Sequence, residues 1–234
     1  MDYFPIFLNL KGRSCLVVGG GAHAIDKTRL LLAAGARVTV VAPRHAAEIE
    51  AWAVAERIAV IGRGFVAGDV RGRTLVIAAT GRDDVDARVA EAAEAAGVPI
   101  NVVDRVELSG FIMPAIVDRE PVVVAISTGG AAPLLAQRLR QTIERALPDR
   151  IGHLARFAGS FRTAVKAKVP TFAARRQFWE TFFDGPAARA VLAGDEPAAS
   201  DRMLRLINGR ENGDILNFPL PRRKTTRTGR QGEN

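Results

Sequence analysis

The chain has 234 residues, of which 48% are hydrophobic, enough for one large globular domain or two small ones. Its net charge at pH 7 is +8, and a basic balance of this kind can indicate binding to nucleic acid. The last thirteen residues hold five basic side chains and one acidic one, so half of the excess lies in that terminal segment. The remainder is only mildly basic, and we expect no nucleic acid among its partners.

The sequence carries no signal for export or membrane insertion. No uninterrupted apolar run approaches the roughly 18 residues of a membrane span, and the first residues lack the basic region of a signal peptide. The single cysteine, Cys15, lies in an apolar run and has no partner for an intrachain disulfide. We therefore expect a cytoplasmic protein without membrane contact.

Five short apolar runs in the first half of the chain have the length of buried β-strands. They cover residues 14–18, 38–41, 58–61, 75–79 and 100–103. The stretches between them have apolar residues at helical spacing, and Gly35 and Gly97 stand where a helix should end before the next strand. This alternation predicts an α/β domain of the Rossmann-like class, with a parallel sheet covered by helices on both faces.

The pattern changes after Val103. Residues 110–117 and 121–127 resemble two strands of a hairpin joined by the polar turn 118–120. From Ala132 onward the sequence is helical in character, with breaks expected near Pro148, Pro170, Gly185 and Gly194. Four aliphatic residues form one helical stripe near the start of this part: Leu134, Leu135, Leu139 and Ile143.

A glycine-rich turn directly follows the first predicted strand and opens a predicted helix. Residues 19–24 match the pattern G-x-G-x-x-A of dinucleotide-binding turns. In that pattern Gly19 permits the tight turn, Gly21 lets the backbone approach a pyrophosphate, and Ala24 lets helix and strand pack closely. The positive helix N-terminus then faces the phosphates. The alternative is a glycine turn without a ligand, but three consecutive glycines carry a conformational cost that packing alone rarely requires.

The choice between NAD and NADP stays open at this point. The usual acidic residue about 20 positions after the turn, which would hold the ribose 2′-hydroxyl, is missing. The second strand is followed instead by Pro43 and Arg44. Arg44 could favour the 2′-phosphate of NADP, and a surface arginine without any ligand is an equally good interpretation.

Asp104 follows the fifth predicted strand, and ligands of open parallel sheets bind beyond the carboxyl ends of the strands. A carboxylate there can accept a proton while a neighbouring carbon loses hydride. By residue type alone, a turn or helix-capping aspartate is the more frequent case. Arg105 is the next residue, and a cation beside Asp104 would lower the pKa of its carboxyl.

At this point the chain resembles a known family, the siroheme synthase N-terminal module of precorrin-2 dehydrogenases and sirohydrochlorin ferrochelatases. The resemblance covers residues 1–210 and rests on ordered matches along the whole of that length. The matching segments are 4–7, 17–21, Lys27, 30–36, 40–43, 78–80, 101–104, 111–119, 127–130 with Pro133, and Arg176 with 178–180.

The resemblance implies NAD as the cofactor. By position it assigns Ala22, His23, Pro43 and Arg44 to cofactor contact. With the motif residues Gly19, Gly21 and Ala24, and with Thr80 after the fourth strand, they form the expected cofactor site. It implies that Asp104 takes part in both dehydrogenation and metal insertion. We expect Asn101, Ser127 and Thr128, which lie in the matching segments, to contact the tetrapyrrole. It also implies a homodimer in which the segment after about residue 113 crosses between subunits.

Together these interpretations divide the chain into four parts. We expect a Rossmann-like NAD-binding domain at 1–113, a strand-containing dimerisation segment at 114–147, a helical region at 148–210 and a basic, disordered tail at 211–234. The histidines His23, His45 and His153 have no metal-motif spacing, so we expect no resident metal and treat ferrous iron as a substrate.

The expected function is NAD-dependent oxidation of precorrin-2 to sirohydrochlorin, with ferrous iron insertion as an additional step. Three alternatives remain at this stage. One is a dehydrogenase without chelatase activity. The others are a non-catalytic NAD-binding regulator, which would not need Asp104, and an NADP-dependent reductase that acts on another small molecule.

Overall fold

The computed structural model describes residues 1–209, and the predicted tail at 211–234 lies outside the described residues. The chain forms two compact units. The first combines Met1–Ala115 with Ile126–Leu139, and the second combines Ile116–Ala125 with the chain from Arg140 onward. The hairpin of residues 115–126 thus belongs to the second unit except for its first and last residues, which belong to the first. The domain boundary that we placed at residue 113 stays a prediction.

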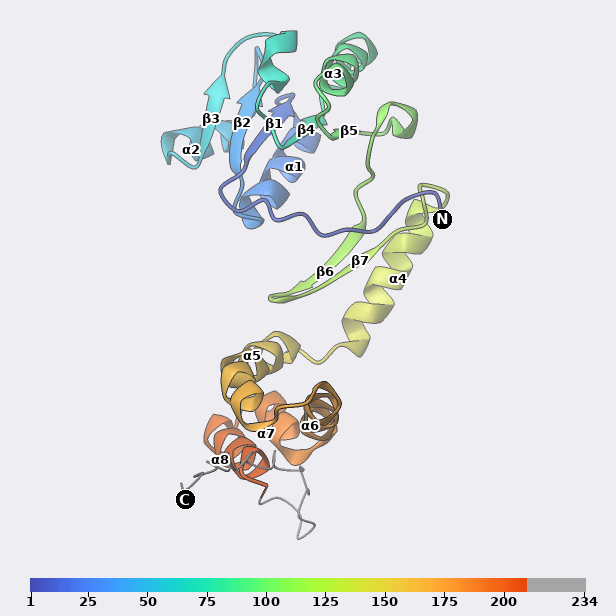
Figure 1. Cartoon of the computed structure of the whole chain (residues 1–234). Helices are drawn as coiled ribbons and strands as arrows, with labels where there is room; N and C mark the ends of the chain where they lie inside the picture. Colours follow the sequence, from blue (N-terminus) through green and yellow to red (C-terminus); the bar gives the residue numbers. More distant parts are fainter. Residues whose placement is uncertain (210–234) are drawn as a thin grey trace, which may run out of the picture. The chain divides into compact units, whose positions relative to one another are not determined.

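The first unit contains a five-stranded parallel sheet in the order β3-β2-β1-β4-β5 (Figure 1). Its strands are β1 (Ser14–Val18), β2 (Arg37–Val41), β3 (Ile58–Ile61), β4 (Leu75–Ala78) and β5 (Ile100–Val102). All five predicted strands are confirmed to within one residue at either end. The strand order reverses between β1 and β4, which is where ligands bind in open α/β sheets.

Helices cover both faces of this sheet. Helices α1 (Ala22–Ala33) and α2 (Ala47–Val54) pack on one face, where Ala24, Leu31 and Ile49 are buried with Val17 and Ile77 of the strands. Helix α3 (Asp83–Ala95) and the short 3-10 helix η1 (Ala67–Val70) pack on the other face. The predicted α/β class with two covered faces is confirmed.

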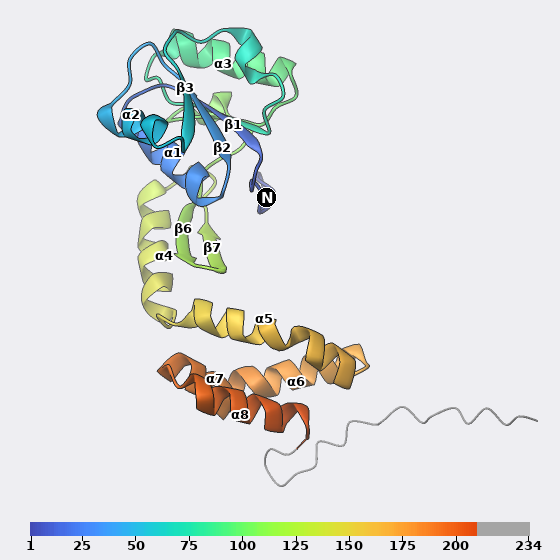
Figure 2. The ribbon, with the colours of Figure 1, turned by 90° about the vertical axis from the view of Figure 1, so that its left-hand side faces the viewer.

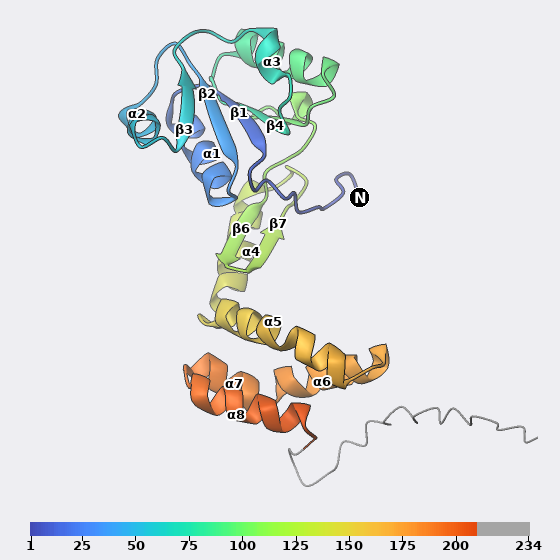
Figure 3. The same cartoon turned by 60° about the vertical axis from the view of Figure 1, so that its left-hand side comes forward.

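The next segment is a two-stranded hairpin of β6 (Ala115–Arg119) and β7 (Val122–Ile126) (Figure 3). The predicted hairpin is confirmed, and its second strand lies within one residue of the predicted 121–127. The first strand, predicted at 110–117, begins later and continues through Arg119, so the predicted turn at 118–120 is wrong. Asp118 and Arg119 belong to β6, and the chain reverses at Glu120 and Pro121. The polar side chains misled the prediction because a strand that is only half-buried accepts them on its exposed face.

The remainder of the described chain is helical, as predicted. The helices are α4 (Pro133–Ala146), α5 (Ile151–Lys168), α6 (Phe172–Asp184), α7 (Pro186–Ala193) and α8 (Glu196–Ile207). Their ends coincide with the predicted breaks, and α7 and α8 lie side by side (Figure 2). Phe178 and Phe182 are fully buried in the core of the second unit, so they serve packing there. No helix between Met1 and Gly209 combines the length and the apolarity that a membrane crossing requires.

Candidate functional site

Backbone hydrogen bonds tie together the carboxyl ends of four neighbouring strands. The Gly19 amide donates to the Val41 carbonyl at the end of β2, and the Ala79 amide donates to Val18 at the end of β1. On the other side, the Val103 amide donates to Ala78 at the end of β4. The glycine turn and the residues after β5 therefore lie along one edge of the sheet, on either side of the strand-order reversal.

The three glycines of the turn meet different surroundings. Gly19 has φ +129°, and a Cβ there would lie 2.3 Å from the Ala79 carbonyl oxygen. A Cβ on Gly20 would lie 2.1 Å from the Arg44 carbonyl oxygen, so packing excludes any side chain at both positions. A Cβ on Gly21, by contrast, would meet nothing within 4 Å. Gly21 thus faces open space just where α1 begins, and its exposed backbone leaves room for a phosphate to approach.

The loop after β2 is held against this turn. The Ala46 amide donates to the Gly20 carbonyl over 2.9 Å, and His45 Nε2 lies 2.6 Å from Glu50 Oε2. Pro43 and Arg44 are exposed beside the turn. Within residues 1–209, the Arg44 guanidinium has no hydrogen bond or ion pair.

At the end of β4, Thr80 is fixed by a buried acid that the sequence analysis did not single out. The Thr80 hydroxyl donates to Asp86 Oδ1 over 2.8 Å, and its amide donates to the same oxygen over 3.3 Å. Asp86 is buried in the first turn of α3. Its carboxylate therefore holds the β4–α3 turn in shape beside the glycine turn.

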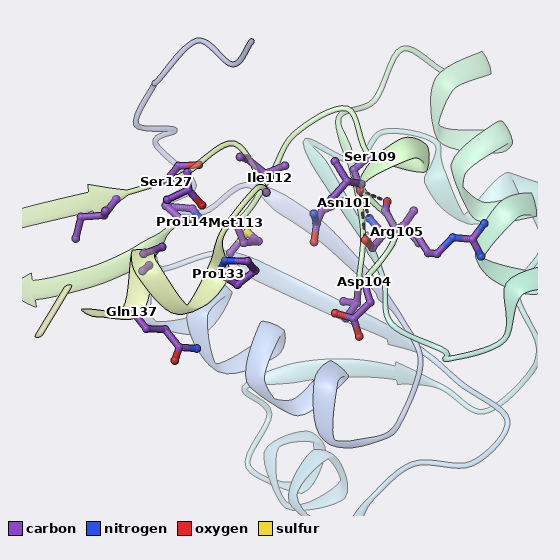
Figure 4. Close-up of a pocket in the computed structure, with 18 of the residues that line it drawn as sticks. Asn101, Asp104, Arg105, Ser109, Ile112, Met113, Pro114, Ser127, Pro133 and Gln137 are labelled. Atoms are coloured by element: carbon purple, nitrogen blue, oxygen red, sulfur yellow. Dashed lines mark hydrogen bonds between the residues drawn. The ribbon is translucent and has the colours of Figure 1, made fainter. Parts of the chain in front are cut away.

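Asp104 lies in a pocket of about 360 Å³ that is built entirely within the first unit (Figure 4). The walls come from the residues after β5, from the approach to β6, from the loop after β7 and from the first turns of α4. Asp104 is exposed and adopts a left-handed backbone with φ 61°, a conformation that aspartate tolerates better than most residues. Its carboxylate has no hydrogen-bond or ion-pair partner among the described residues.

The pocket brings together four predicted residues, namely Asp104, Asn101, Ser127 and Thr128. The other predicted site residues, which belong to the glycine turn, to the loop after β2 and to Thr80, do not line it. This separation fits one region for a cofactor and a neighbouring one for a substrate.

Asn101 is buried at the base of the pocket, where its Nδ2 donates to the Phe111 carbonyl over 3.0 Å. Ser109 acts similarly, because its hydroxyl accepts from the Val102 amide over 2.9 Å and donates to the Arg105 carbonyl over 2.8 Å. These contacts clamp the turn that carries Asp104. Asn101 thus has a structural role in addition to its place in the lining.

Arg105 does not face Asp104. Its guanidinium lies 2.8 Å from Asp83 and also pairs with Glu107, and it points away from the Asp104 carboxylate in Figure 4. The carboxylates of Glu107 and Asp83 raise the pKa of Arg105, with the hydrogen bond that Arg105 donates to Glu107 as the largest cause. The expectation that the Arg105 cation would lie beside the Asp104 carboxylate is therefore wrong.

The loop between β7 and α4 forms the opposite wall of the pocket. Ser127 Oγ accepts from the Gly129 amide over 3.0 Å, and Thr128 Oγ1 accepts from the Ala132 amide over 3.1 Å. Gly129 and Gly130 adopt φ values of +65° and +88°, which favour glycine. Because each hydroxyl accepts a bond here, its own proton stays available for a ligand oxygen.

Two further pocket residues were missed as site residues. Lys27, from α1, and Gln137, from α4, both line the pocket. Lys27 is among the residues on which the family resemblance rests, and its helical spacing from the glycine turn is the signal that could have identified it as a site residue. Among residues 1–209, no group of three His, Cys, Asp or Glu side chains is arranged to hold a metal ion.

Three family models match consecutive parts of the chain. One described as putative NAD(P)-binding matches residues 6–115, the central region of sirohaem biosynthesis proteins matches 119–146, and the sirohaem synthase dimerisation region matches 150–207. The chain belongs to the family of the siroheme synthase N-terminal module. The NAD(P)-binding match covers the sheet, the glycine turn and the Asp104 turn.

Siroheme synthases from two bacteria illustrate the extent of the likeness. That of Thioalkalivibrio sulfidiphilus is 45% identical over 207 residues, which is 88% of this chain and 42% of the relative. That of Chromobacterium violaceum is 47% identical over 207 residues, covering 88% of this chain and 44% of the relative. The chain thus spans less than half the length of the curated relatives it matches.

A solved structure supports the fold of this chain. SirC, a precorrin-2 dehydrogenase, superposes with a TM-score of 0.69 over 88% of this chain and 99% of its own, at 24% sequence identity. At that identity the likeness establishes the fold, including the parallel sheet and the helical C-terminal region.

Proposed function

We propose that this protein oxidises precorrin-2 to sirohydrochlorin with NAD, and that Asp104 is the general base. The proposal depends on one observation above all. An unpartnered carboxylate lies in a pocket at the same sheet edge as a glycine turn that leaves Gly21 open. The family's NAD(P)-binding match and the precorrin-2 dehydrogenase activity named for SirC support this proposal.

The residues of the turn fit a dinucleotide. A Cβ at Gly21 would meet only open space, and the fully buried Ala24 lets α1 pack closely on the sheet. The first amides of α1 would hold the pyrophosphate, with Ala22 and His23 beside it and Pro43 and Arg44 near the adenosine. When bound, the nicotinamide accepts a hydride. The chain itself contributes orientation and proton transfer.

Oxidation of precorrin-2 removes a hydride from one ring carbon and a proton from the macrocycle. Asp104 is suited to take the proton because its carboxylate oxygens are free of protein donors and face the pocket. Asn101, Ser127 and Thr128 would position the macrocycle through their polar atoms. The clamp formed by Asn101 and Ser109 fixes the base relative to the sheet.

The same carboxylate suits a second step, in which ferrous iron is a substrate. Iron insertion releases two pyrrole protons, and Asp104 is the acceptor that we propose for them. The test is to supply sirohydrochlorin and ferrous iron and to follow the absorption spectrum of the product. Siroheme formation that depends on Asp104 supports a bifunctional enzyme, and an unchanged sirohydrochlorin spectrum limits the protein to oxidation.

The decisive variant is Asp104→Ala. We expect kcat for precorrin-2 oxidation to fall by a factor of about 100 or more, because a general base contributes on that order. NAD binding should stay intact, since Asp104 lies outside the glycine turn. Asp149→Ala, at an exposed site between α4 and α5, is the matched control. Near-normal rates in Asp104→Ala would refute the assignment of the base.

Cofactor choice needs its own measurement. We propose NAD, which the family resemblance implies, although the exposed Arg44 would suit the 2′-phosphate of NADP equally well by charge. Titration of the protein with NAD and with NADP should give tighter binding for NAD. If NADP bound more tightly and Arg44→Ala removed that preference, the cofactor assignment would be reversed.

A further inference from the structure

The pocket that holds Asp104 contains only two basic side chains among the described residues, Lys27 and Arg105. Arg105 is paired with Asp83 and Glu107, which neutralise its charge. The ammonium group of Lys27 has no hydrogen bond or ion pair within residues 1–209. The ammonium group of Lys27 is therefore the one uncompensated positive charge of the described pocket.

The position of Lys27 separates it from the cofactor turn. It is the sixth residue of α1, half-buried, and it lines the pocket together with Asp104, Ser127 and Thr128. Gly19, Gly21, Ala22 and the other cofactor-side residues do not line that pocket. The Lys27 stem thus runs from the cofactor helix into the space proposed for the substrate.

A half-buried ammonium group without a counter-ion lowers the stability of the fold, because the group loses part of its hydration and gains no ion pair. The neighbouring surface of α1 shows the usual compensation, since Arg29 pairs with Asp26 at 3.1 Å and with Glu48 at 2.9 Å. Lys27 lacks such a partner, and Asp104 is equally unpartnered in the same pocket. Both charges are left free for a bound molecule.

We propose that Lys27 binds a peripheral carboxylate of the tetrapyrrole and so orients the macrocycle over Asp104. This inference rests on the proposed function, because precorrin-2 and sirohydrochlorin each carry eight carboxylates. A flexible lysine suits this task, since its three donors can follow a carboxylate on a mobile side chain. Lys27 is a substrate-binding residue and takes no proton in the reaction.

The test is to compare Lys27→Met with the wild-type protein in steady-state oxidation of precorrin-2. We expect KM for precorrin-2 to rise about tenfold, the size of one charge-assisted contact, while KM for NAD stays unchanged. The wild-type KM should rise with ionic strength, and that dependence should weaken in the variant. Lys27→Arg keeps the charge and should recover most of the affinity. Lys166→Met, exposed on α5, is the matched control.

The possible outcomes distinguish a failure of the role proposed for Lys27 from a failure of the proposed dehydrogenase function. An unchanged KM for precorrin-2 in an active Lys27→Met enzyme would overturn the role of Lys27 and leave the dehydrogenase intact. A raised KM for NAD would instead assign Lys27 to the pyrophosphate and also overturn it. If the wild-type protein does not oxidise precorrin-2, the proposed function fails. In that case the affinity for sirohydrochlorin, measured by fluorescence, tests the role of Lys27. Equal affinities of Lys27→Met and the wild-type protein would overturn that role.

Discussion

At the residue scale, the glycines of the turn serve two purposes. Gly19 and Gly20 allow close packing, and Gly21 allows a ligand to approach. Gly19 and Gly20 are glycines because neighbouring carbonyl groups occupy the space of a side chain. Gly21 has no such neighbour, and its φ of −92° is accessible to any residue. The motif requires glycine only at the positions of Gly19 and Gly21, and only the structure shows why each of the three residues is a glycine.

This difference predicts opposite results for two minimal substitutions. Gly20→Ala places a methyl group against the Arg44 carbonyl, so we expect a loss of stability of about 1–3 kcal/mol from forced displacement of the loop. Gly21→Ala should leave the melting temperature close to wild type but weaken NAD binding, because the methyl group occupies the approach of the pyrophosphate.

Thermal unfolding and NAD titration measure both effects. Equal NAD affinity in wild type and Gly21→Ala would show that no dinucleotide phosphate approaches this residue. The Gly20→Ala variant serves as the internal control, since its defect should appear in stability first.

Other site residues show what the sequence could and could not reveal. Asp104 was identified because it follows a buried strand at the expected ligand edge. The partners of Arg105 were not foreseeable, because Asp83 lies at the start of another helix and only the folded turn brings the two together. Asp86 was missed for the same reason, since its bond to Thr80 depends on the shape of the β4–α3 turn.

At the element scale, the strands of the sheet and the existence of the hairpin were predictable, but the bounds of the first hairpin strand and the position of its turn were not. A parallel strand is buried on both faces, so its apolar run in the sequence marks its ends closely. Strand β6 has an exposed Asp118 and a half-buried Arg119, so polarity alone suggested a turn too early.

The entry into β4 depends on a buried acid, Asp69 of η1. Its carboxylate accepts from Arg63 over 2.7 and 2.9 Å and from the Val66 amide over 3.0 Å, and its carbonyl accepts from Arg73. The hydrogen bond from Arg63 is the largest cause that lowers the pKa of Asp69, with the Val66 amide and the charge of Arg73 adding to it and burial opposing it. Asp69 should therefore stabilise the fold in its ionised form.

The sign of the pH dependence follows from that lowered pKa. The stabilisation is fully present above the unfolded-state pKa of Asp, about 3.9, and is lost as pH falls through the lower folded-state value. Asp69→Asn should thus cost about 1–3 kcal/mol in unfolding free energy at pH 7 and progressively less below about pH 4.

Urea unfolding at several pH values measures this dependence. Asp84→Asn is the control, because Asp84 forms an exposed pair with Arg82 and should change stability little. A constant difference between wild type and Asp69→Asn at every pH would contradict the role assigned to the Asp69 carboxylate.

At the scale of the whole molecule, large apolar side chains on α4 and α6 are exposed in the single chain. On α4, Leu134 is 63% exposed, and Leu135 and Leu139 of the same predicted stripe are also exposed. In the region that matches the sirohaem synthase dimerisation model, Phe172 of α6 is 78% exposed. Large exposed apolar side chains in groups are typical of protein interfaces, and a homodimer is the partner that we propose for them.

The variants Leu134→Asp and Phe172→Asp test separately whether α4 and α6 take part in the dimer interface. A charge at a dimer interface should raise the dimer dissociation constant by a factor of about ten or more and leave the monomer folded. Val54→Asp, on a side chain that is 76% exposed on α2, is the control. Sedimentation analysis over a range of concentrations distinguishes the surfaces, and a wild-type protein that stays monomeric throughout would contradict the dimer.

The central claim is that the open glycine turn and the Asp104 pocket form one oxidoreductase site. The most direct measurement supplies the purified protein with precorrin-2 and NAD and follows the absorption of NADH and sirohydrochlorin together. The account predicts that both products rise in equal amounts and that Asp104→Ala abolishes both while still binding NAD. Absence of NADH in the wild-type reaction, with intact NAD binding, would contradict it.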